Sequence, residues 1–253
     1  MDLQGKWALV TGAAHRVGKN IALNLSQHGC NIYLHYGRSI DAAEETAQEL
    51  RNNGSKVELI QANLSDPNEI DSLFSNILSS QNQLDICVNS AASFIKKPVT
   101  DFSVEDWDKV QHTNLRAPFL VSQKSAKIMM HNNGNTKGNI IFISDLSGVF
   151  PWQGFSVHGV SKAGIIHLTE SLAYELAPNI RVNGVIPGLI LPPPNIDEKR
   201  WENMINNIPL KRSGNPDFVS DAILFLLKND FLTGNLIYVD GGEHLVGSIN
   251  HQG

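Results

Sequence analysis

Residues 140–163 read IIFISDLSGVFPWQGFSVHGVSKA and contain a strand, a loop and a helix from which the fold can be worked out. Ile140–Ile143 is an apolar run that predicts a buried strand, which ends just before Asp145. A loop punctuated by glycine and proline follows, and a helix then carries His158 and Lys162, four positions apart and therefore on one helical face. A carboxylate opposite an imidazole and an amine can handle protons; a surface loop with incidental polar residues is the alternative.

The same order of strand and helix repeats along the rest of the chain. The expected strands are Trp7–Thr11, Asn31–Tyr36, Lys56–Gln61, Leu84–Asn89, Gly138–Ser144, Ile180–Ile186 and Leu236–Val239. The expected helices are Val17–His28, about Ser39–Asn52, one capped by Ser65-Asp66-Pro67, a region from near Ser103 towards Met130, the helix of His158, and Pro216–Lys228. Such alternation predicts an α/β fold, with a parallel sheet covered by helices on both faces.

Length and composition narrow the class of protein. The chain has 253 residues and no linker-like stretch, so we expect one domain, 1–253. A net charge of -5 argues against nucleic-acid binding, and no apolar run is long enough to span a membrane. The start, MDLQGKWALV, lacks the features of a signal peptide, and Cys30 and Cys87 are predicted to be buried, reduced thiols. We therefore expect a cytoplasmic protein.

The junction between the first strand and the first helix is a glycine-containing turn. Residues 11–18 read TGAAHRVG, with glycines at Gly12 and Gly18. A turn of this kind presents backbone N–H groups and a helix N-terminus to a pyrophosphate. The spacing differs from the G-x-G-x-x-G pattern, so a simple tight turn remains the alternative at this point.

Further landmarks occur in a fixed order along nearly the whole chain. They are Thr11-Gly12 with Gly18, Val88-Asn89-Ser90-Ala91, Asn114, the helix of Lys162, Pro187-Gly188 and Val239-Asp240-Gly241-Gly242. Together they resemble the short-chain dehydrogenase/reductase family. The resemblance implies a single Rossmann-type doubly wound domain with a seven-stranded parallel sheet, assembled into a homotetramer.

The family's active site is an Asn, Ser, Tyr, Lys tetrad, with the Tyr four residues before the Lys and thirteen after the Ser. Placed on this chain, the tetrad implies Asn114, Asp145, His158 and Lys162 as catalytic residues. Ser144 is one residue out of register, so Asp145 takes the place of the serine, which is a mark of the pteridine reductases within the family. His158 replaces the general-acid tyrosine, and none of the chain's four tyrosines lies where it could obviously substitute.

Other positions also resemble the branch of pteridine and dihydromonapterin reductases. Arg16 stands where most relatives have a middle glycine, residues 35–39 read HYGRS, and residues 240–245 read DGGEHL. Ser93-Phe94 resembles a pair whose Phe stacks on the pterin, and 189–191 is also close to this branch. The substrate-binding residues that the resemblance implies are Phe94, Asp145 and Leu189.

The end of the second strand predicts the cofactor. An NAD site usually has a carboxylate there for the ribose hydroxyl, whereas Arg38 and Ser39 offer a guanidinium and a hydroxyl to a 2′-phosphate, and Gly37 leaves room. Asp41 is expected to support the next helix, so we expect NADP (NADPH). With the family landmarks, the expected cofactor-binding residues are Gly12, Arg16, Val17, Gly18, Arg38, Ser39, Asn63, Leu64, Asn89, Ala91, Lys162, Pro187 and Gly188.

The substrate side is less determined by the sequence. Phe94 can either stack on a substrate ring or belong to the core. Residues 187–210 match the family's variable substrate loop, which can act as a lid or be a mere crossover. The histidines have no metal-ligand spacing, so we assign no metal; His244 is expected at the surface rather than in a neighbouring subunit's site.

The leading hypothesis is an NADPH-dependent reductase of a pterin-like small-molecule substrate, with no nucleic-acid or membrane partner. In it, Asp145 and His158 deliver a proton, Lys162 holds the nicotinamide ribose, and Asn114 supports a water relay. One alternative is a carbonyl or 3-oxoacyl reductase of the same family. The other is a protein that binds NADP without catalysis, because His158 replaces the tyrosine.

Overall fold

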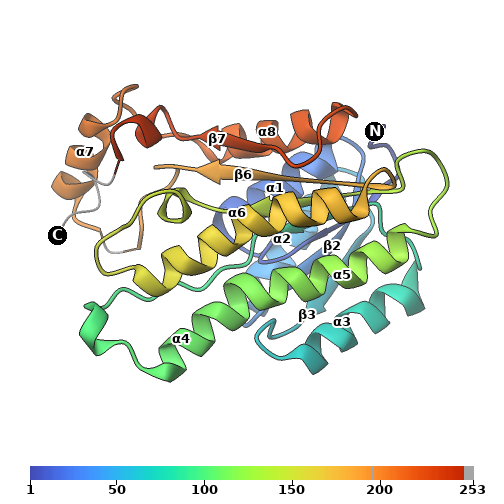
Figure 1. The fold of residues 1–253 in the computed structure, drawn as a ribbon. Helices are drawn as coiled ribbons and strands as arrows, with labels where there is room; N and C mark the ends of the chain where they lie inside the picture. Colours follow the sequence, from blue (N-terminus) through green and yellow to red (C-terminus); the bar gives the residue numbers. More distant parts are fainter. Residues whose placement is uncertain (195, 248–253) are drawn as a thin grey trace.

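The computed structural model describes residues 1–194 and 196–247 and contains one sheet between two layers of helices (Figure 1). The seven strands are all parallel, in the order β3-β2-β1-β4-β5-β6-β7. Their bounds are β1 Trp7–Val10, β2 Asn31–Tyr36, β3 Val57–Gln61, β4 Ile86–Asn89, β5 Gly138–Ile143, β6 Ile180–Pro187 and β7 Leu236–Val239. The seven-stranded Rossmann-type fold expected from the sequence is confirmed.

The helices alternate with the strands. They are α1 Arg16–Gln27, α2 Ile40–Asn52, α3 Pro67–Ser80, α4 Val104–Gln111, α5 Ala117–Met129, α6 Ser156–Leu176, α7 Glu198–Asn207 and α8 Pro216–Lys228, with short helical segments η1 Val99–Asp101, η2 His112–Arg116, η3 Leu146–Gly148 and η4 Glu243–Leu245. Capping fixes several starts: the Asp66 side chain accepts a hydrogen bond from the Asn68 N–H at the start of α3, as its sequence predicts.

Two apolar clusters occupy the two faces of the sheet. One joins the strands to α1, α2 and α8, and the other joins them to α3, α5 and α6. Both cysteines are free and buried in these clusters, as expected. Within residues 1–194 and 196–247, no helix combines the length and apolarity that a membrane span requires.

Two segments differ from the sequence expectation. The region from Ser103 to Met130 is helical throughout but contains η2, a π-helical turn between α4 and α5. The substrate loop, 187–210, contains α7, a helix that we did not predict. The Asp197 side chain caps α7 by accepting a hydrogen bond from the Arg200 N–H. The three prolines just before it indicate a loop, and they outweighed this short helix-start signal in the sequence.

The register brings the carboxyl ends of the central strands to one edge. Val10 of β1 pairs with Val88 of β4, Asn89 pairs with Phe142 of β5, and Ile143 pairs with Val185 of β6. The sheet order reverses direction between β1 and β4, because β2 and β3 extend one way and β4 to β7 the other. In open parallel sheets, a ligand site forms at such a reversal.

Candidate active site

A cavity of about 1040 Å³ lies at this edge and is lined by the segments that follow β1 to β6. Its lining includes eleven of the thirteen residues expected to bind the cofactor: Gly12, Arg16, Val17, Gly18, Arg38, Asn63, Leu64, Ala91, Lys162, Pro187 and Gly188. Ser39 follows Arg38 at the N-cap position of α2, without a side-chain capping bond in the described part of the chain. Asn89 is buried, and its amide donates to the Ser122 hydroxyl. The expected residues therefore lie in or beside one cavity.

The turn after β1 has the shape of a phosphate cradle. Gly12 has a φ of +69°, and a Cβ there would lie 3.0 Å from the Ala91 Cα; a Cβ on Gly18 would lie 2.2 Å from the Gly12 carbonyl oxygen. The N-cap residue of α1, His15, makes no side-chain capping bond among the described residues, and the first turn carries no acidic residue. The helix N-terminus therefore suits a pyrophosphate, and these residues fit a dinucleotide.

Arg16 stands at a strained position within this turn. Its φ is +52°, unusual for a residue with a side chain. Its guanidinium donates to the carbonyl oxygens of Leu191 and Pro192, at 3.4 and 3.0 Å. Arg16 therefore connects the turn after β1 to the start of the substrate loop.

The end of β2 is open and basic. Arg38 is exposed and lines the cavity, and a Cβ at Gly37 would meet nothing within 4 Å. Asp41 lies in the first turn of α2, as expected. The Asn63 side chain accepts from the backbone and hydroxyl of Ser65, so it shapes its own loop.

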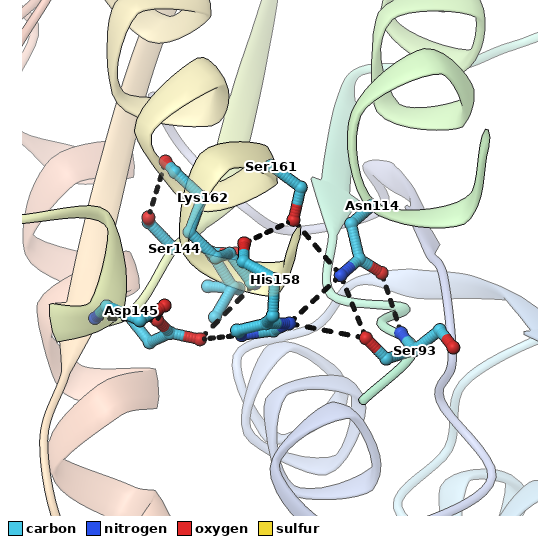
Figure 2. A network of polar contacts seen from close by, with 9 residues as sticks. Ser93, Asn114, Ser144, Asp145, His158, Ser161 and Lys162 are labelled. Atoms are coloured by element: carbon cyan, nitrogen blue, oxygen red, sulfur yellow. Dashed lines mark hydrogen bonds and ion pairs between the residues drawn. The ribbon is translucent and has the colours of Figure 1, made fainter. Parts of the chain in front are cut away.

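The four expected catalytic residues form one network of hydrogen bonds and an ion pair (Figure 2). Asn114 comes from η2, a π-helical turn of the kind often found at functional sites, and is 2% exposed. Its amide oxygen accepts from the Ser93 N–H at 2.6 Å, and its amide nitrogen donates to the Ser93 carbonyl at 2.9 Å. Asn114 therefore ties the segment after β4 to the histidine.

His158 lies between two polar partners and is fully buried. Its Nε2 is 2.8 Å from the Asp145 Oδ2, and its Nδ1 is 3.2 Å from the Asn114 amide nitrogen and 3.3 Å from the Ser93 carbonyl oxygen. A neutral ring with its hydrogen on Nε2 donates to Asp145 and accepts from Asn114. A doubly protonated ring has an oxygen acceptor at each nitrogen, Asp145 and the Ser93 carbonyl. The site can hold the imidazole in either form.

The Asp145 carboxylate faces the cavity with 14% of its side chain exposed. Its Oδ1 accepts from the N–H of Ser147 at 3.0 Å and from the Ser147 hydroxyl. Burial by itself raises the pKa of Asp145, but the hydrogen bond from His158 and the charge of Lys162 outweigh it and lower the pKa to about 2. Asp145 is therefore an anion at the cavity wall at physiological pH.

Lys162 completes the network from α6. Its Nζ donates to the Ile143 carbonyl at 2.9 Å and lies 3.9 Å from the Asp145 Oδ2. Burial lowers the pKa of Lys162, and the charge of Asp145 opposes that shift. Ser144, one residue out of register, instead donates its hydroxyl to the Lys162 carbonyl. The roles assigned to these four side chains stay predictions.

Of the three expected substrate residues, Phe94 and Asp145 line the cavity, and Leu189 does not. Phe94 is 57% exposed at the cavity, so the core reading of this residue is wrong. Its ring lies over His158 with centroids 3.8 Å apart. Leu189 is 9% exposed, and its backbone N–H donates to Glu243, whereas Ile190 and Leu191 line the cavity. The run 189–191 signalled a loop at the site, but not which of its side chains turns inward.

Two further histidines, His244 and His35, also have side-chain hydrogen-bond partners. His244 is partly exposed and its Nδ1 lies 2.7 Å from Asp240, within the same chain. The sequence assigned His35 no role beyond its place in the HYGRS segment, yet His35 is buried at the cavity and accepts a hydrogen bond from the Gly12 N–H. The sequence feature that could have identified His35 is its position as a polar residue within an apolar strand. No metal-binding cluster is found among residues 1–194 and 196–247.

Comparison with known proteins places this cavity in a wide group of oxidoreductases. A family model described as Enoyl-(Acyl carrier protein) reductase matches residues 12–244. The chain is 34% identical over 245 residues to the 3-oxoacyl-(acyl-carrier-protein) reductase FabG of Staphylococcus aureus, covering 95% of this chain and 98% of that one. It is 33% identical over 251 residues to glucose 1-dehydrogenase 2 of Bacillus subtilis, with 96% of each chain covered.

Solved structures agree. A putative short-chain alcohol dehydrogenase from Sinorhizobium meliloti superposes with a TM-score of 0.90 at 28% identity, covering 97% of this chain and 98% of that one. A short-chain dehydrogenase/reductase from Serratia marcescens gives a TM-score of 0.88 at 29% identity, covering 96% and 99%. Fold and sequence therefore match the same group of proteins over nearly their full length.

Proposed function

The chain belongs to the short-chain dehydrogenase/reductase family, and from this premise we propose that it is an NADPH-dependent reductase of a C=N bond in a flat, pterin-like ring. The observation that carries the proposal is the ionised Asp145 carboxylate at the cavity wall, hydrogen-bonded to His158. It stands where the family has a neutral hydroxyl, and this changes which hydride acceptor the site favours.

The charge of Asp145 decides between two kinds of acceptor. Reduction of a carbonyl develops negative charge on oxygen, and a carboxylate beside that oxygen repels it. Reduction of an imine is assisted by a proton on nitrogen, and a carboxylate attracts a protonated nitrogen or an N–H group. A ring with C=N and N–H groups therefore suits Asp145 better than a ketone does.

The aromatic wall of the cavity supports a flat substrate. Phe94 exposes 57% of its surface, and Trp152 also lines the cavity. Phe155 meets Phe94 edge-on, with centroids 6.0 Å apart, and thereby braces it. A braced, exposed ring offers a stacking face to a planar heterocycle.

NADPH, when bound in the cavity, would supply the hydride. The side chains of the protein deliver the proton and hold the reacting groups in position. Because His158 is fully buried, its proton reaches the substrate through Asp145. The protonated imidazole gives its Nε2 proton to the Asp145 carboxylate, and the resulting carboxyl group passes a proton to the substrate nitrogen. This leaves Asp145 ionised and His158 neutral, with its remaining hydrogen on Nδ1 towards the Ser93 carbonyl. Lys162 holds the nicotinamide ribose and keeps Asp145 acidic, while Asn114 fixes the ring of His158.

We propose that the protein prefers NADPH to NADH, because of the residues at the end of β2. Arg38 is exposed at the cavity and Ser39 is adjacent, whereas the nearest carboxylate, Asp41, lies within α2. A guanidinium can bind a 2′-phosphate through two parallel hydrogen bonds. These groups support a phosphorylated ribose at this end of the cavity.

A carbonyl or 3-oxoacyl substrate is the second candidate, and the relatives favour it. One of them is a 3-oxoacyl-(acyl-carrier-protein) reductase that aligns over 95% of this chain, and another is a glucose dehydrogenase. A third outcome, binding of NADPH without turnover, is supported by the burial of His158 where the family has a tyrosine.

We also propose a cytoplasmic homotetramer. The free, buried thiols of Cys30 and Cys87 support a reducing compartment. An apolar groove of about 340 Å³ between η2, α5 and α6, with the exposed side chain of Phe119 at its edge, supports packing of α5 and α6 against a second copy. Light scattering of the purified protein tests the mass of the assembly.

The deciding experiment measures NADPH oxidation against 7,8-dihydropterin, an oxidised pterin, a 3-oxoacyl thioester and a simple ketone, with glucose and NADP for the reverse direction. We expect the pterins to react at least about tenfold faster than the ketones, a difference of about 1.4 kcal/mol in the barrier. Lys162→Met gives the background rate. Faster reaction of the thioester establishes the second candidate. Binding of NADPH without turnover of any substrate establishes the third.

A further inference from the structure

His35 is a buried imidazole on the cofactor side of the cavity, away from the Asp145–His158 network. It lies on β2 and is 3% exposed. Its Nδ1 accepts a hydrogen bond from the Gly12 N–H at 3.0 Å, and its Nε2 lies 3.0 Å from the Ala62 carbonyl oxygen. The ring therefore bridges the turn after β1 and the segment after β3.

The two bonds fix which form of the ring is present. A backbone N–H can only donate, so Nδ1 must be unprotonated; a carbonyl oxygen can only accept, so Nε2 must carry the hydrogen. The pKa of His35 agrees with this neutral form, because burial lowers it to about 4 and the bond to Ala62 opposes the shift only in part. The backbone carbonyl of His35 also accepts from the Ala13 N–H at 2.9 Å, so one residue holds two successive amides of the turn.

The turn around Gly12 depends on contacts with other segments to keep its shape. Gly12 adopts a φ of +69°, and the chain passes so close to Ala91 that a side chain cannot fill the space. Glycine keeps more conformational freedom than other residues unless its backbone groups are bonded. Loss of the acceptor for the Gly12 N–H would let the turn change shape, and the pyrophosphate cradle with it.

We propose that His35 is a positioning residue for the cofactor: its neutral ring clamps the Gly12 turn to the Ala62 segment, and so holds the pyrophosphate cradle in the shape that binds a dinucleotide. The inference rests on the proposed function for its ligand, but it concerns affinity for NADPH and NADH alike, not the choice of substrate. His35 touches the backbone that holds the cofactor, so it acts on binding through Gly12.

The proposal is tested with three variants that separate the two hydrogen bonds. His35→Phe keeps a ring but loses both bonds, His35→Asn places an amide oxygen near the position of Nδ1, and His35→Gln reaches towards Ala62 instead. Loss of a buried hydrogen bond is worth about 1–3 kcal/mol, or roughly five- to a hundredfold in Kd. We expect His35→Phe to weaken NADPH and NADH by a similar factor in this range, His35→Asn to recover most of the loss, and His35→Gln to recover less.

A second readout needs no cofactor. Hydrogen exchange at the Gly12 amide of the ligand-free protein should speed up at least about tenfold in His35→Phe and return towards the native rate in His35→Asn, because an unbonded amide exchanges faster. Unchanged cofactor Kd in His35→Phe, or Gly12 exchange that is the same in all variants, overturns the proposal. If the native protein binds no dinucleotide, the proposed function fails, and the Gly12 exchange still decides whether His35 clamps the turn.

The pH dependence of Gly12 amide exchange distinguishes the hydrogen-bonded clamp from simple packing. The titratable side chains on the segments against His35 are His15 and Arg16 on the turn, Arg38 beyond β2 and Glu69 on α3, whose carboxylate accepts from the Asn63 N–H. All four are exposed, and none is a cause of the His35 pKa shift. Because only the unprotonated ring accepts from Gly12, native Gly12 exchange should rise relative to His35→Asn as pH falls towards 4. Parallel pH dependence of the two proteins contradicts the clamp.

Discussion

Two buried histidines mark the two halves of the cavity, and their partners differ in kind. His35, on the cofactor side, bonds a backbone N–H and a backbone carbonyl. His158, on the substrate side, bonds the Asp145 carboxylate and the Asn114 amide. Uncharged backbone partners fix one ring in its neutral form, whereas a carboxylate and a nearby carbonyl oxygen at His158 can accommodate a second proton. The same side chain is suited to holding structure in one half and to moving a proton in the other.

The difference extends to what surrounds each ring. The cofactor half presents backbone N–H groups and an arginine, which suit a phosphorylated ligand. The substrate half presents a carboxylate and an exposed aromatic face, which suit a flat ring with N–H groups. Changes in one half should therefore leave the other half's ligand largely unaffected, and this separation can be tested.

The largest effect is expected for Asp145→Asn, which removes the charge in the substrate half and keeps the shape. Positioned proton transfer contributes about 10²–10⁴-fold, so kcat on dihydropterin should fall by a factor in that range. The Kd of NADPH should change by less than about twofold, because the carboxylate lies outside the cradle of the pyrophosphate. Steady-state kinetics and calorimetric titration measure the two quantities.

Asp101→Asn is the matched control, because Asp101 is exposed on η1. It should change neither kcat nor Kd. An unchanged kcat in Asp145→Asn would remove the carboxylate from the reaction and with it the distinction between the two halves.

The next effect is the pH dependence of stability contributed by His35. Its pKa is lowered from 6.5 to about 4 in the folded protein, so protonation favours the unfolded chain. The contribution is fully present above pH 6.5 and is lost as pH falls towards 4. The shift corresponds to about 3 kcal/mol.

Urea unfolding of the native protein and His35→Asn over this pH range measures the contribution, since groups common to both proteins cancel. As the pH drops, the free energy of unfolding of the native protein should fall relative to that of His35→Asn. A stability difference that does not change between pH 6.5 and 4 would show that His35 is not held neutral.

Arg38→Ala should act on the cofactor half alone and by a smaller amount. Loss of a charge-assisted contact costs about 1.5–3 kcal/mol, or about one to two decades in the Kd of NADPH. The Kd of NADH should barely change, because NADH lacks the 2′-phosphate. Fluorescence titration with both cofactors measures this difference, and equal native affinities for NADPH and NADH would contradict the assignment of NADP.

The smallest effect is expected for Phe94→Ala in the substrate half. Stacking contributes about 0.5–1.5 kcal/mol beyond area burial, so pterin binding should weaken by roughly two- to tenfold. NADPH binding and the melting temperature should stay close to native, because 57% of Phe94 is exposed. Joint loss of both ligands and of stability would instead make Phe94 a packing residue. Phe231→Ala, at a position 97% exposed, is the control.

The two halves also differ in how well the sequence predicted them. The cofactor half follows general rules of local structure: an apolar strand, a glycine turn and a helix start. Together with the family landmarks, these rules placed Gly12, Gly18 and Arg38 at the cofactor site. The clamp by His35 could not, because it joins three segments whose distance apart is set by the packed sheet. The bonded partner of a buried polar side chain is a tertiary fact.

In the substrate half, the sequence indicated which residues meet but not how they meet. Spacing and resemblance brought Asp145, His158 and Lys162 together, and in the structure the Asp145 carboxylate lies 2.8 Å from the His158 Nε2 and 3.9 Å from the Lys162 Nζ. Burial of His158 beneath Phe94 and the inward turn of Ile190 rather than Leu189 depend on side-chain packing. The helix α7 was missed because the three prolines before it signal a loop more strongly than its short polar start signals a helix.

The central claim is that His158 and Asp145 deliver the proton that completes reduction of a C=N bond. Its most direct test is the rate of dihydropterin reduction by NADPH from about pH 5 to about pH 9, in the native protein, His158→Phe and His158→Tyr. The native rate should exceed that of His158→Phe by about 10²–10⁴-fold, because a phenyl ring cannot supply the proton that Asp145 passes on. His158→Tyr should retain turnover, because a phenol can also donate a proton. The exposed His167→Phe serves as the control on α6. A flat, near-zero native rate across this range, on every pterin and ketone tried, would contradict the account and leave a protein that only binds NADPH.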